Sequence, residues 1–271
     1  AEMIASAIVR WLLVPVLAFP AIWSNVAPAR AQSCAPASAY QQSVETVAGS
    51  VPLVIHIMER PLQPCVVGSQ WTPEKVALVF GPSMQDRRGV NSVWGPIGGR
   101  FFVRTVEIHE YTPPAGMLAS VPDGPLGSQA FETGFKDLVT EFHRVGSVNV
   151  YLWAFIPGFP MGFGRSPITG EGKATVWLES ACLDSRLVSP EQCGRAAAHE
   201  LGHALGLYHV GGGCANVQAN HRSQCDKLSA PCGEWQDSER LMKKGDDATS
   251  NTRKLCTVEV EEARQMAREL K

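Results

Sequence analysis

Residues 196–209 of this chain read AAAHELGHALGLYH. The alanines and leucines are good helix formers, so this stretch predicts an α-helix. His199 and His203 are four residues apart, which places both imidazoles on one face of that helix, one turn apart. Two imidazoles placed in this way can bind a single zinc ion, and Glu200 is then the candidate general base for a metal-activated water.

The residues after the second histidine predict a sharp end to the helix and a third metal ligand. Gly206 has no Cβ and accepts a positive φ, so the chain can turn there. That turn brings His209 back toward His199 and His203 and leaves the fourth zinc position open for water. We therefore expect one catalytic Zn²⁺ ion, bound by these three histidines. An ordinary amphipathic helix with two core histidines is the alternative, but it leaves Gly206 and His209 unexplained.

The spacing His199-Glu200-x-x-His203-x-x-Gly206-x-x-His209 resembles the signature of the metzincin family of zinc endopeptidases. The resemblance implies an α+β catalytic domain with an α/β-like N-terminal half, in which helices and an active-site helix back a twisted mixed sheet. It also implies a small, irregular C-terminal lobe that disulfides hold together. The overall layout is similar to pappalysin-like and matrixin-like members.

A second feature of that family is a methionine in a tight turn beneath the zinc ligands. Met242, within the stretch ERLMKKG at residues 239–245, is the candidate for this Met-turn. The resemblance implies that Met242 packs under the histidines as an apolar floor without binding the metal. Lys244 stands two residues beyond it, where astacin-like members carry a tyrosine ligand, so that subfamily is not expected.

Composition and the N-terminal residues indicate a folded, exported protein. The 271 residues are 45% hydrophobic and 18% charged with a net charge of −2, which predicts a sizeable core and gives no reason to expect nucleic acid as a partner. An apolar run at residues 11–23 follows Arg10 and precedes Ala-Arg-Ala at 29–31, as in a secretory signal peptide spanning residues 1–31. The run is short and contains two prolines, so we expect no stable membrane insertion after its removal. Extracellular or periplasmic secretion is therefore predicted.

The cysteines agree with export. All eight lie after residue 31, and an even number in an oxidising compartment predicts up to four disulfides. The local pairs Cys225–Cys232 and Cys182–Cys193 are the first candidates. A second zinc site made of thiolates is the alternative, but no CxxC pair occurs.

The hydrophobic pattern predicts a sheet-and-helix order in front of the zinc helix, within a domain at residues 32–271. Four strands are expected at residues 51–58, 101–109, 148–156 and 173–179. Helices are expected from Pro73 after the N-cap Thr72, at 90–94, at 131–144 and at 258–271, with 157–172 as a loop. The domain divides into subdomains at about 50–210 and 211–271. His56 and His109 fall within strands, where hydrogen-bonded core histidines are favoured over metal ligands.

The last predicted strand carries a further implication of the resemblance. In metzincins the strand in this place is the sheet edge, and a peptide substrate adds to it as another strand. The backbone groups expected to bind substrate belong to Ala174, Thr175, Val176, Trp177 and Leu178. A plain edge strand without that function has the same sequence signature.

We expect a secreted zinc endopeptidase that acts on protein or peptide substrates. A catalytically silent metzincin-fold binding module is the alternative, and the retained Glu200 argues against it. A zinc hydrolase acting on a non-protein amide has the same ligands. A thermolysin-like arrangement with Glu234 or Glu239 as third ligand is disfavoured because His209 stands at the required spacing. Cleavage specificity, Ca²⁺ sites and oligomeric state are not readable from the sequence.

Overall fold

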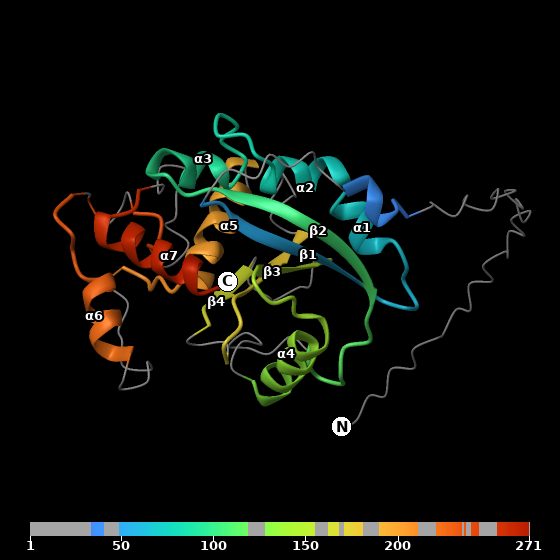
Figure 1. Ribbon diagram of the computed structural model, residues 1–271. Coiled ribbons are helices and arrows are strands. Elements are labelled where there is room, and N and C mark those ends of the chain that lie inside the picture. Colours follow the sequence, from blue (N-terminus) through green and yellow to red (C-terminus); the bar gives the residue numbers. More distant parts are fainter. Residues whose placement is uncertain are drawn as a thin grey trace, which may run out of the picture. The chain divides into compact units, whose positions relative to one another are not determined.

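Five strands of the computed structural model form one mixed, twisted sheet (Figure 1). They are β1 (Val51–Glu59), β2 (Phe101–Glu110), β3 (Val148–Trp153), β4 (Gly162–Arg165) and β5 (Thr175–Glu179). The strand order is β2-β1-β3-β5-β4. All neighbours pair in parallel except β4, which is antiparallel to β5.

The structure describes residues 34–40, 49–118, 128–154, 162–167, 171–180, 190–210, 221–234, 236, 240–243 and 254–270. All of them belong to one compact unit, residues 33–271. The predicted signal peptide at residues 1–31 lies outside the described residues.

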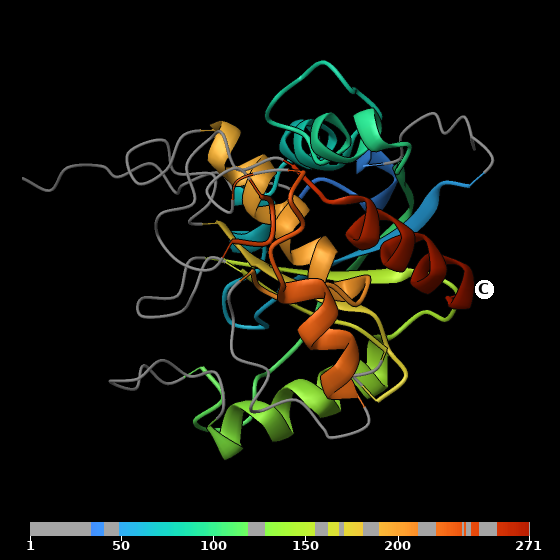
Figure 2. The same ribbon diagram turned by 90° about the vertical axis from the view of Figure 1, so that its left-hand side faces the viewer.

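Helices cover both faces of the sheet. They are α1 (Val66–Gln70), α2 (Pro73–Phe80), α3 (Asn91–Trp94), α4 (Gln129–Phe142), α5 (Pro190–Ala204), α6 (Arg222–Ser229) and α7 (Thr257–Glu269), with 3₁₀ turns η1 (Ala37–Tyr40) and η2 (Gly95–Ile97). Figures 1 and 2 both show α2 and α3 on one side of the sheet and α4 on the other.

Two apolar cores follow from this layering, because successive side chains of a strand point to opposite faces. Leu53, Ile55 and Ile57 of β1 pack in one core with residues of α2, α3, α5 and α7. Met58 of β1 and Tyr151 of β3 pack in the other core with residues of α4. The zinc-motif helix α5 therefore lies on the face opposite α4.

Most of the predicted elements are confirmed, and their local signals are visible. Thr72 precedes α2, and its hydroxyl accepts a bond from the Lys75 amide. At the start of α4 the Ser128 hydroxyl accepts from the Phe131 amide at 3.2 Å. Both contacts satisfy an amide that the first helical turn leaves without a partner. Helix α6 was not predicted and lies in the lobe that was expected to be irregular.

The sheet edge differs from the sequence-based prediction. Ala174 and the strand residues Thr175, Val176, Trp177 and Leu178 are at most 1% exposed, and β5 pairs with β3 on one side and β4 on the other. Their backbone groups are therefore not free to pair with a peptide, and the prediction of an edge strand at 174–178 is wrong. The edge next to β5 is β4, which lies in the stretch predicted as a loop, and β2 forms the other edge.

Disulfides fix both ends of the described unit. Cys34 pairs with Cys65, with Cα atoms 5.1 Å apart, and so ties the N-terminal arm to the start of α1. Cys232 pairs with Cys256 at the N-cap of α7, with Cα atoms 6.2 Å apart. The predicted pair Cys225–Cys232 is thus wrong: Cys225 is buried on α6 and belongs to another disulfide.

Cys193 is also disulfide-bonded, but Cys182 lies outside the described residues, so the pair Cys182–Cys193 stays a prediction.

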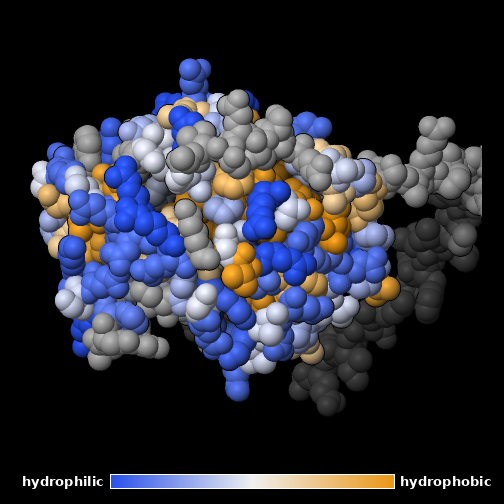
Figure 3. Space-filling model, in the orientation of Figure 1, coloured by the Kyte–Doolittle hydropathy of each residue, from blue (hydrophilic) through white to orange (hydrophobic). Residues whose placement is uncertain are grey.

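The visible surface is mostly hydrophilic around α6 and α7, with hydrophobic residues in separate small groups (Figure 3). Among the described residues, none of the helices combines the length and the apolar character that a membrane crossing needs.

Candidate metal centre

Helix α5 and the turn that ends it position the candidate metal ligands. The helix ends at Ala204, and Gly206 takes a φ of +84° in the turn that follows. The Leu207 amide donates to the Gly202 carbonyl and the Gly206 amide to the His203 carbonyl, each at 3.0 Å. This pair of bonds is the Schellman motif, which requires a left-handed residue at the helix end. The predicted role of Gly206 in turning the chain is confirmed.

The turn brings His209 against the two helical histidines. The Nε2 atom of His209 lies 3.1 Å from Nε2 of His199 and 3.0 Å from Nε2 of His203. Zinc binds imidazole nitrogens at about 2.0–2.1 Å, so three donors this close together can share one ion. These three side chains form one of the two groups of potential metal ligands among the described residues.

The opposite ring nitrogens are held by backbone carbonyls. His199 Nδ1 lies 2.7 Å from the Leu241 oxygen, and His203 Nδ1 lies 2.8 Å from the Leu207 oxygen. A carbonyl only accepts, so Nδ1 carries the proton in both rings and each Nε2 presents a lone pair. Burial lowers the pKa of His199 to about 4 and that of His203 well below its ordinary value. Both rings are therefore neutral at pH 7, and the donor set fits a zinc ion.

Met242 packs against Gly202 of α5, the residue before His203. Its side chain is fully buried, and a Cβ added to Gly202 of α5 would stand 2.5 Å from the Met242 sulfur. The turn that carries it closes with a bond from the Lys243 amide to the Arg240 carbonyl, and the Met242 carbonyl accepts from the Val210 amide at 2.9 Å. The turn thus packs against α5 and orients His199 through the Leu241 carbonyl.

A buried ion pair anchors this turn, and it was not predicted from the sequence. The Arg240 guanidinium donates to Glu259 of α7 at 2.9 Å, and both side chains are 0% exposed. It also donates to the carbonyls of Leu228 and Ala230 at the end of α6. Nothing in the local sequence marks this pair, because its members are far apart along the chain.

Glu200 occupies the contact between α5 and the edge strand. A Cβ on Gly164 would stand 2.1 Å from the Glu200 carbonyl oxygen, so only glycine lets β4 approach the helix this closely. Burial raises the pKa of the Glu200 carboxyl to about 8, and the Gly164 amide and the positive charge of Arg195 partly offset this increase. A metal ion beside the carboxyl would lower this pKa through its positive charge.

The other predicted histidines lie on the opposite face of the sheet. His56 is fully buried, stacks on Tyr151 with ring centroids 4.7 Å apart, and bonds through Nε2 to the Asn149 side-chain oxygen at 2.9 Å. The prediction of a hydrogen-bonded core histidine is confirmed for His56. His109 of β2 lies next to it, with Nε2 at 3.0 Å from His56 Nδ1.

The buried state of His56 predicts a pH dependence of stability in metal-free protein. Burial lowers the pKa of His56 from 6.5 to about 4, so the unfolded chain binds this proton more tightly than the folded chain. The stabilising contribution is complete above pH 6.5 and is lost as the pH falls toward 4, amounting to on the order of 3 kcal/mol. Chemical denaturation across this range is expected to show a weaker pH dependence for His56→Leu than for the unmutated chain. Parallel curves would contradict the assignment.

Comparisons with known proteins point to metalloproteases. The extracellular metalloprotease of Arthroderma benhamiae is 31% identical over 104 residues, covering 32% of this chain and 35% of the relative. The extracellular metalloprotease of Trichophyton verrucosum gives the same values. The chain therefore spans about a third of the length of the curated relatives that it matches. No model of a protein family matches the chain.

Two solved structures show a distant likeness. Archaemetzincin from Methanopyrus kandleri has a TM-score of 0.39 at 16% identity, covering 83% of this chain and 99% of that chain. Metalloproteinase-II from Bacteroides fragilis has a TM-score of 0.29 at 10% identity, covering 66% of this chain and 52% of that chain. Both scores are low, so neither likeness carries a conclusion about the activity of this chain.

Proposed function

We propose that this chain is a zinc-dependent endopeptidase of the metzincin type that hydrolyses peptide bonds. The observation that carries the proposal is the convergence of three imidazole Nε2 atoms beside Glu200, with His199 and His203 on α5 and His209 after it. The metalloprotease relatives support the same reaction class. Met242 is proposed as the apolar floor of the site.

Each residue of the site has a defined chemical task in this proposal. His199, His203 and His209 would hold the ion through Nε2. A zinc ion bound in this way polarises a carbonyl as a Lewis acid and lowers the pKa of a bound water toward ~7. The Glu200 carboxylate would accept a proton from the attacking water and deliver it to the leaving amine nitrogen. Because the chain retains Glu200 as a candidate general base, we favour a peptidase over a catalytically silent binding module.

We infer that the substrate pairs with the outer edge of β4. This strand is antiparallel to β5 and ends the sheet, so its outward backbone groups are placed to pair with an extended peptide. Gly162 and Gly164 bring β4 against Glu200, with a Cβ on Gly162 standing 3.1 Å from Glu200 Cγ. A peptide on this edge would therefore run past the proposed general base.

Export and domain layout complete the proposal. Residues 1–31 are proposed as a signal peptide, and residues 32–271 as a catalytic domain with subdomains at about 50–210 and 211–271. The disulfides Cys34–Cys65 and Cys232–Cys256 support an oxidising compartment.

Metal removal tests the proposed reaction. The chain is incubated with a library of quenched fluorescent peptides before and after treatment with a strong chelator, and then after addition of zinc. We expect cleavage in the untreated sample, its loss on chelation and its return with zinc, because the attacking water and the scissile carbonyl both depend on the ion. Cleavage that persists in the fully stripped protein, or no cleavage by a folded chain with zinc at the three histidines, would contradict the proposal.

A further inference from the structure

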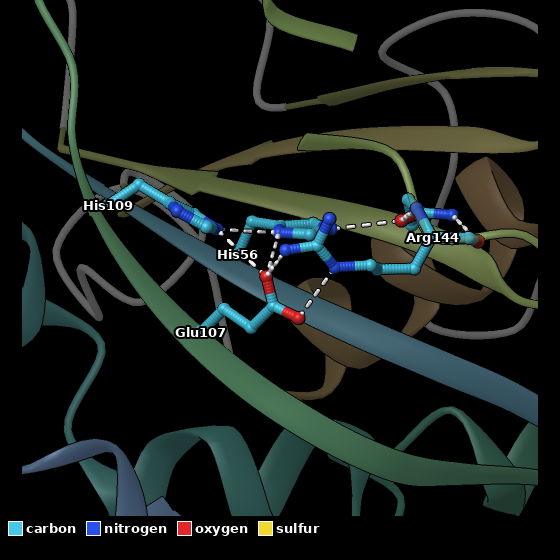
Figure 4. A network of polar contacts seen from close by, with 5 residues as sticks. His56, Glu107, His109 and Arg144 are labelled. Atoms are coloured by element: carbon cyan, nitrogen blue, oxygen red, sulfur yellow. Dashed lines mark hydrogen bonds and ion pairs between the residues drawn. The ribbon is translucent and has the colours of Figure 1, made fainter. Parts of the chain in front are cut away.

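His56, Glu107 and His109 form a second group of potential metal ligands (Figure 4). It lies on the α4 side of the sheet, where the His109 ring packs against Phe142 of α4 with centroids 4.1 Å apart. His56 Nδ1 is 3.0 Å from His109 Nε2, and Glu107 Oε2 is 3.3 Å from His109 Nε2 and 3.8 Å from His56 Nδ1. The three ligand atoms form a compact triangle contributed by β1 and β2. None of these residues has a part in the proposed peptidase site, which is on the other face.

The register of the sheet creates this cluster. In the parallel pair of β1 and β2, His56 is opposite Glu107 and Met58 is opposite His109. The register shifts by one residue between Leu53 and Val54, so an unshifted pairing would place different β2 residues beside His56. The irregularity therefore brings one carboxylate and two imidazoles to the same face.

We propose that His56, Glu107 and His109 bind a divalent transition-metal ion that links β1 to β2. Donors bound at 2.0–2.2 Å with tetrahedral angles lie about 3.3–3.6 Å from one another, and the observed spacings of 3.0, 3.3 and 3.8 Å bracket that range. Two imidazoles and one carboxylate suit zinc and similar borderline ions. Calcium and magnesium prefer sites made of oxygen ligands.

The neighbours of the cluster orient its ligand atoms. The Asn149 amide nitrogen donates to the Arg144 and Ser147 carbonyls, which fixes its oxygen as the acceptor facing His56 Nε2. His56 therefore carries its proton on Nε2 and presents a lone pair at Nδ1. The Arg144 guanidinium bonds both oxygens of Glu107, at 2.8 and 2.7 Å, and so holds the carboxylate in place.

The protonation states also suit metal binding. Burial lowers the pKa of His56 to about 4 and also lowers that of His109, so both rings are neutral at pH 7. The bond from Arg144 helps to hold the pKa of Glu107 below its usual value, although burial opposes this. In metal-free protein the His109 Nε2–H donates to His56 Nδ1; metal binding moves that proton to His109 Nδ1.

Access to the cluster comes from the His109 and Glu107 side. The side chain of His56 is 0% exposed, whereas those of His109 and Glu107 are 13% and 23% exposed. An ion can therefore enter from solvent and bind with water in its fourth position.

Metal stoichiometry tests the proposal on the full chain. Bound zinc is measured in four forms of the protein, each equilibrated at a low, buffered concentration of free zinc. These forms are the unmutated chain, His199→Ala/His203→Ala, His109→Gln, and the triple variant His199→Ala/His203→Ala/His109→Gln. We expect about two ions in the first form, about one in each of the next two, and none in the last. Glutamine at 109 retains a donor toward His56, so the metal-free network is preserved. His221→Gln is the matched control outside both clusters and is expected to retain both ions.

Thermal unfolding gives a readout that does not depend on activity. In the His199→Ala/His203→Ala background, added zinc is expected to raise the Tm, and His109→Gln is expected to abolish this shift. Crystals of the unmutated protein soaked in zinc provide a test without substitutions: anomalous scattering is expected between His56 Nδ1 and His109 Nε2. One ion per chain, no Tm shift in the double variant and anomalous signal at the three catalytic histidines alone would overturn the proposal.

Discussion

Glu200→Gln is expected to lower kcat/KM for peptide hydrolysis by about 10²–10⁴-fold while zinc remains bound. Glutamine keeps the size of the side chain but cannot accept a proton from the attacking water or pass it to the leaving amine. The proposed metal ligands are unchanged, because His199, His203 and His209 would bind the ion through their own Nε2 atoms. The loss should therefore fall on kcat more than on KM.

The measurement is steady-state cleavage of one quenched peptide, with zinc content determined on the same samples. Glu261→Gln is the matched control, since Glu261 is an exposed carboxylate on α7 and the same atoms are exchanged. It is expected to cleave at the unmutated rate. Full activity in Glu200→Gln would show that Glu200 is not the general base. An equal loss of activity in Glu261→Gln would show that the loss does not arise at the proposed metal site.

The zinc-motif helix could be predicted because its information is local. Spacing alone places His199 and His203 on one helix face, and glycine at 206 predicts the turn that brings His209 back toward them. The strands β1, β2, β3 and β5 were also predicted, since each is a short run of apolar and β-branched residues. For these elements, the sequence pattern and the packing agree.

Strand β4 could not be found by the same reasoning. Its sequence is Gly-Phe-Gly-Arg, and glycine disfavours a strand when only local preference is considered. The glycines are explained by tertiary packing, because a Cβ on Gly164 would meet the Glu200 carbonyl oxygen at 2.1 Å. Missing β4 made β5 look like the edge of the sheet, and the substrate-pairing prediction for residues 174–178 failed for that reason.

The polar clusters show a similar limit. Arg240 and Glu259 belong to segments that have no common sequence pattern, and only the fold brings them together in the interior. His56 and His109 were correctly placed in strands, but their juxtaposition depends on the register shift between β1 and β2. Register between distant strands is set by packing of the whole face, which local patterns do not encode.

The ion pair beneath the Met242 turn gives the second large expected effect. Arg240→Met is expected to lower the free energy of unfolding by about 3–5 kcal/mol, because Glu259 is left buried without its cationic partner. The Leu228 and Ala230 carbonyls also lose a donor. Since Arg240 begins the turn that carries Leu241 and Met242, zinc affinity should fall together with stability.

The pH dependence of this variant separates the charge effect from lost packing. Burial already raises the pKa of Glu259, and removing the Arg240 charge raises it further. A carboxyl whose folded-state pKa is raised stabilises the fold when protonated, and that contribution is lost as the pH rises. The stability deficit of Arg240→Met should therefore be largest near pH 7 and shrink in mild acid, as denaturant titrations at several pH values can measure.

Arg240→Met/Glu259→Leu is the matched control for the single variant. Replacing both charges with apolar groups removes the unpaired carboxylate, so much of the lost stability should return and its excess pH dependence should disappear. A double variant as unstable as the single one would show that the hydrogen bonds from Arg240 to the α6 carbonyls, rather than its charge, hold the turn. The single variant could instead match the unmutated chain in both stability and zinc affinity. That result would show that the turn does not depend on this ion pair, so the position of His199 would have to be held by the contact of Met242 with Gly202 alone.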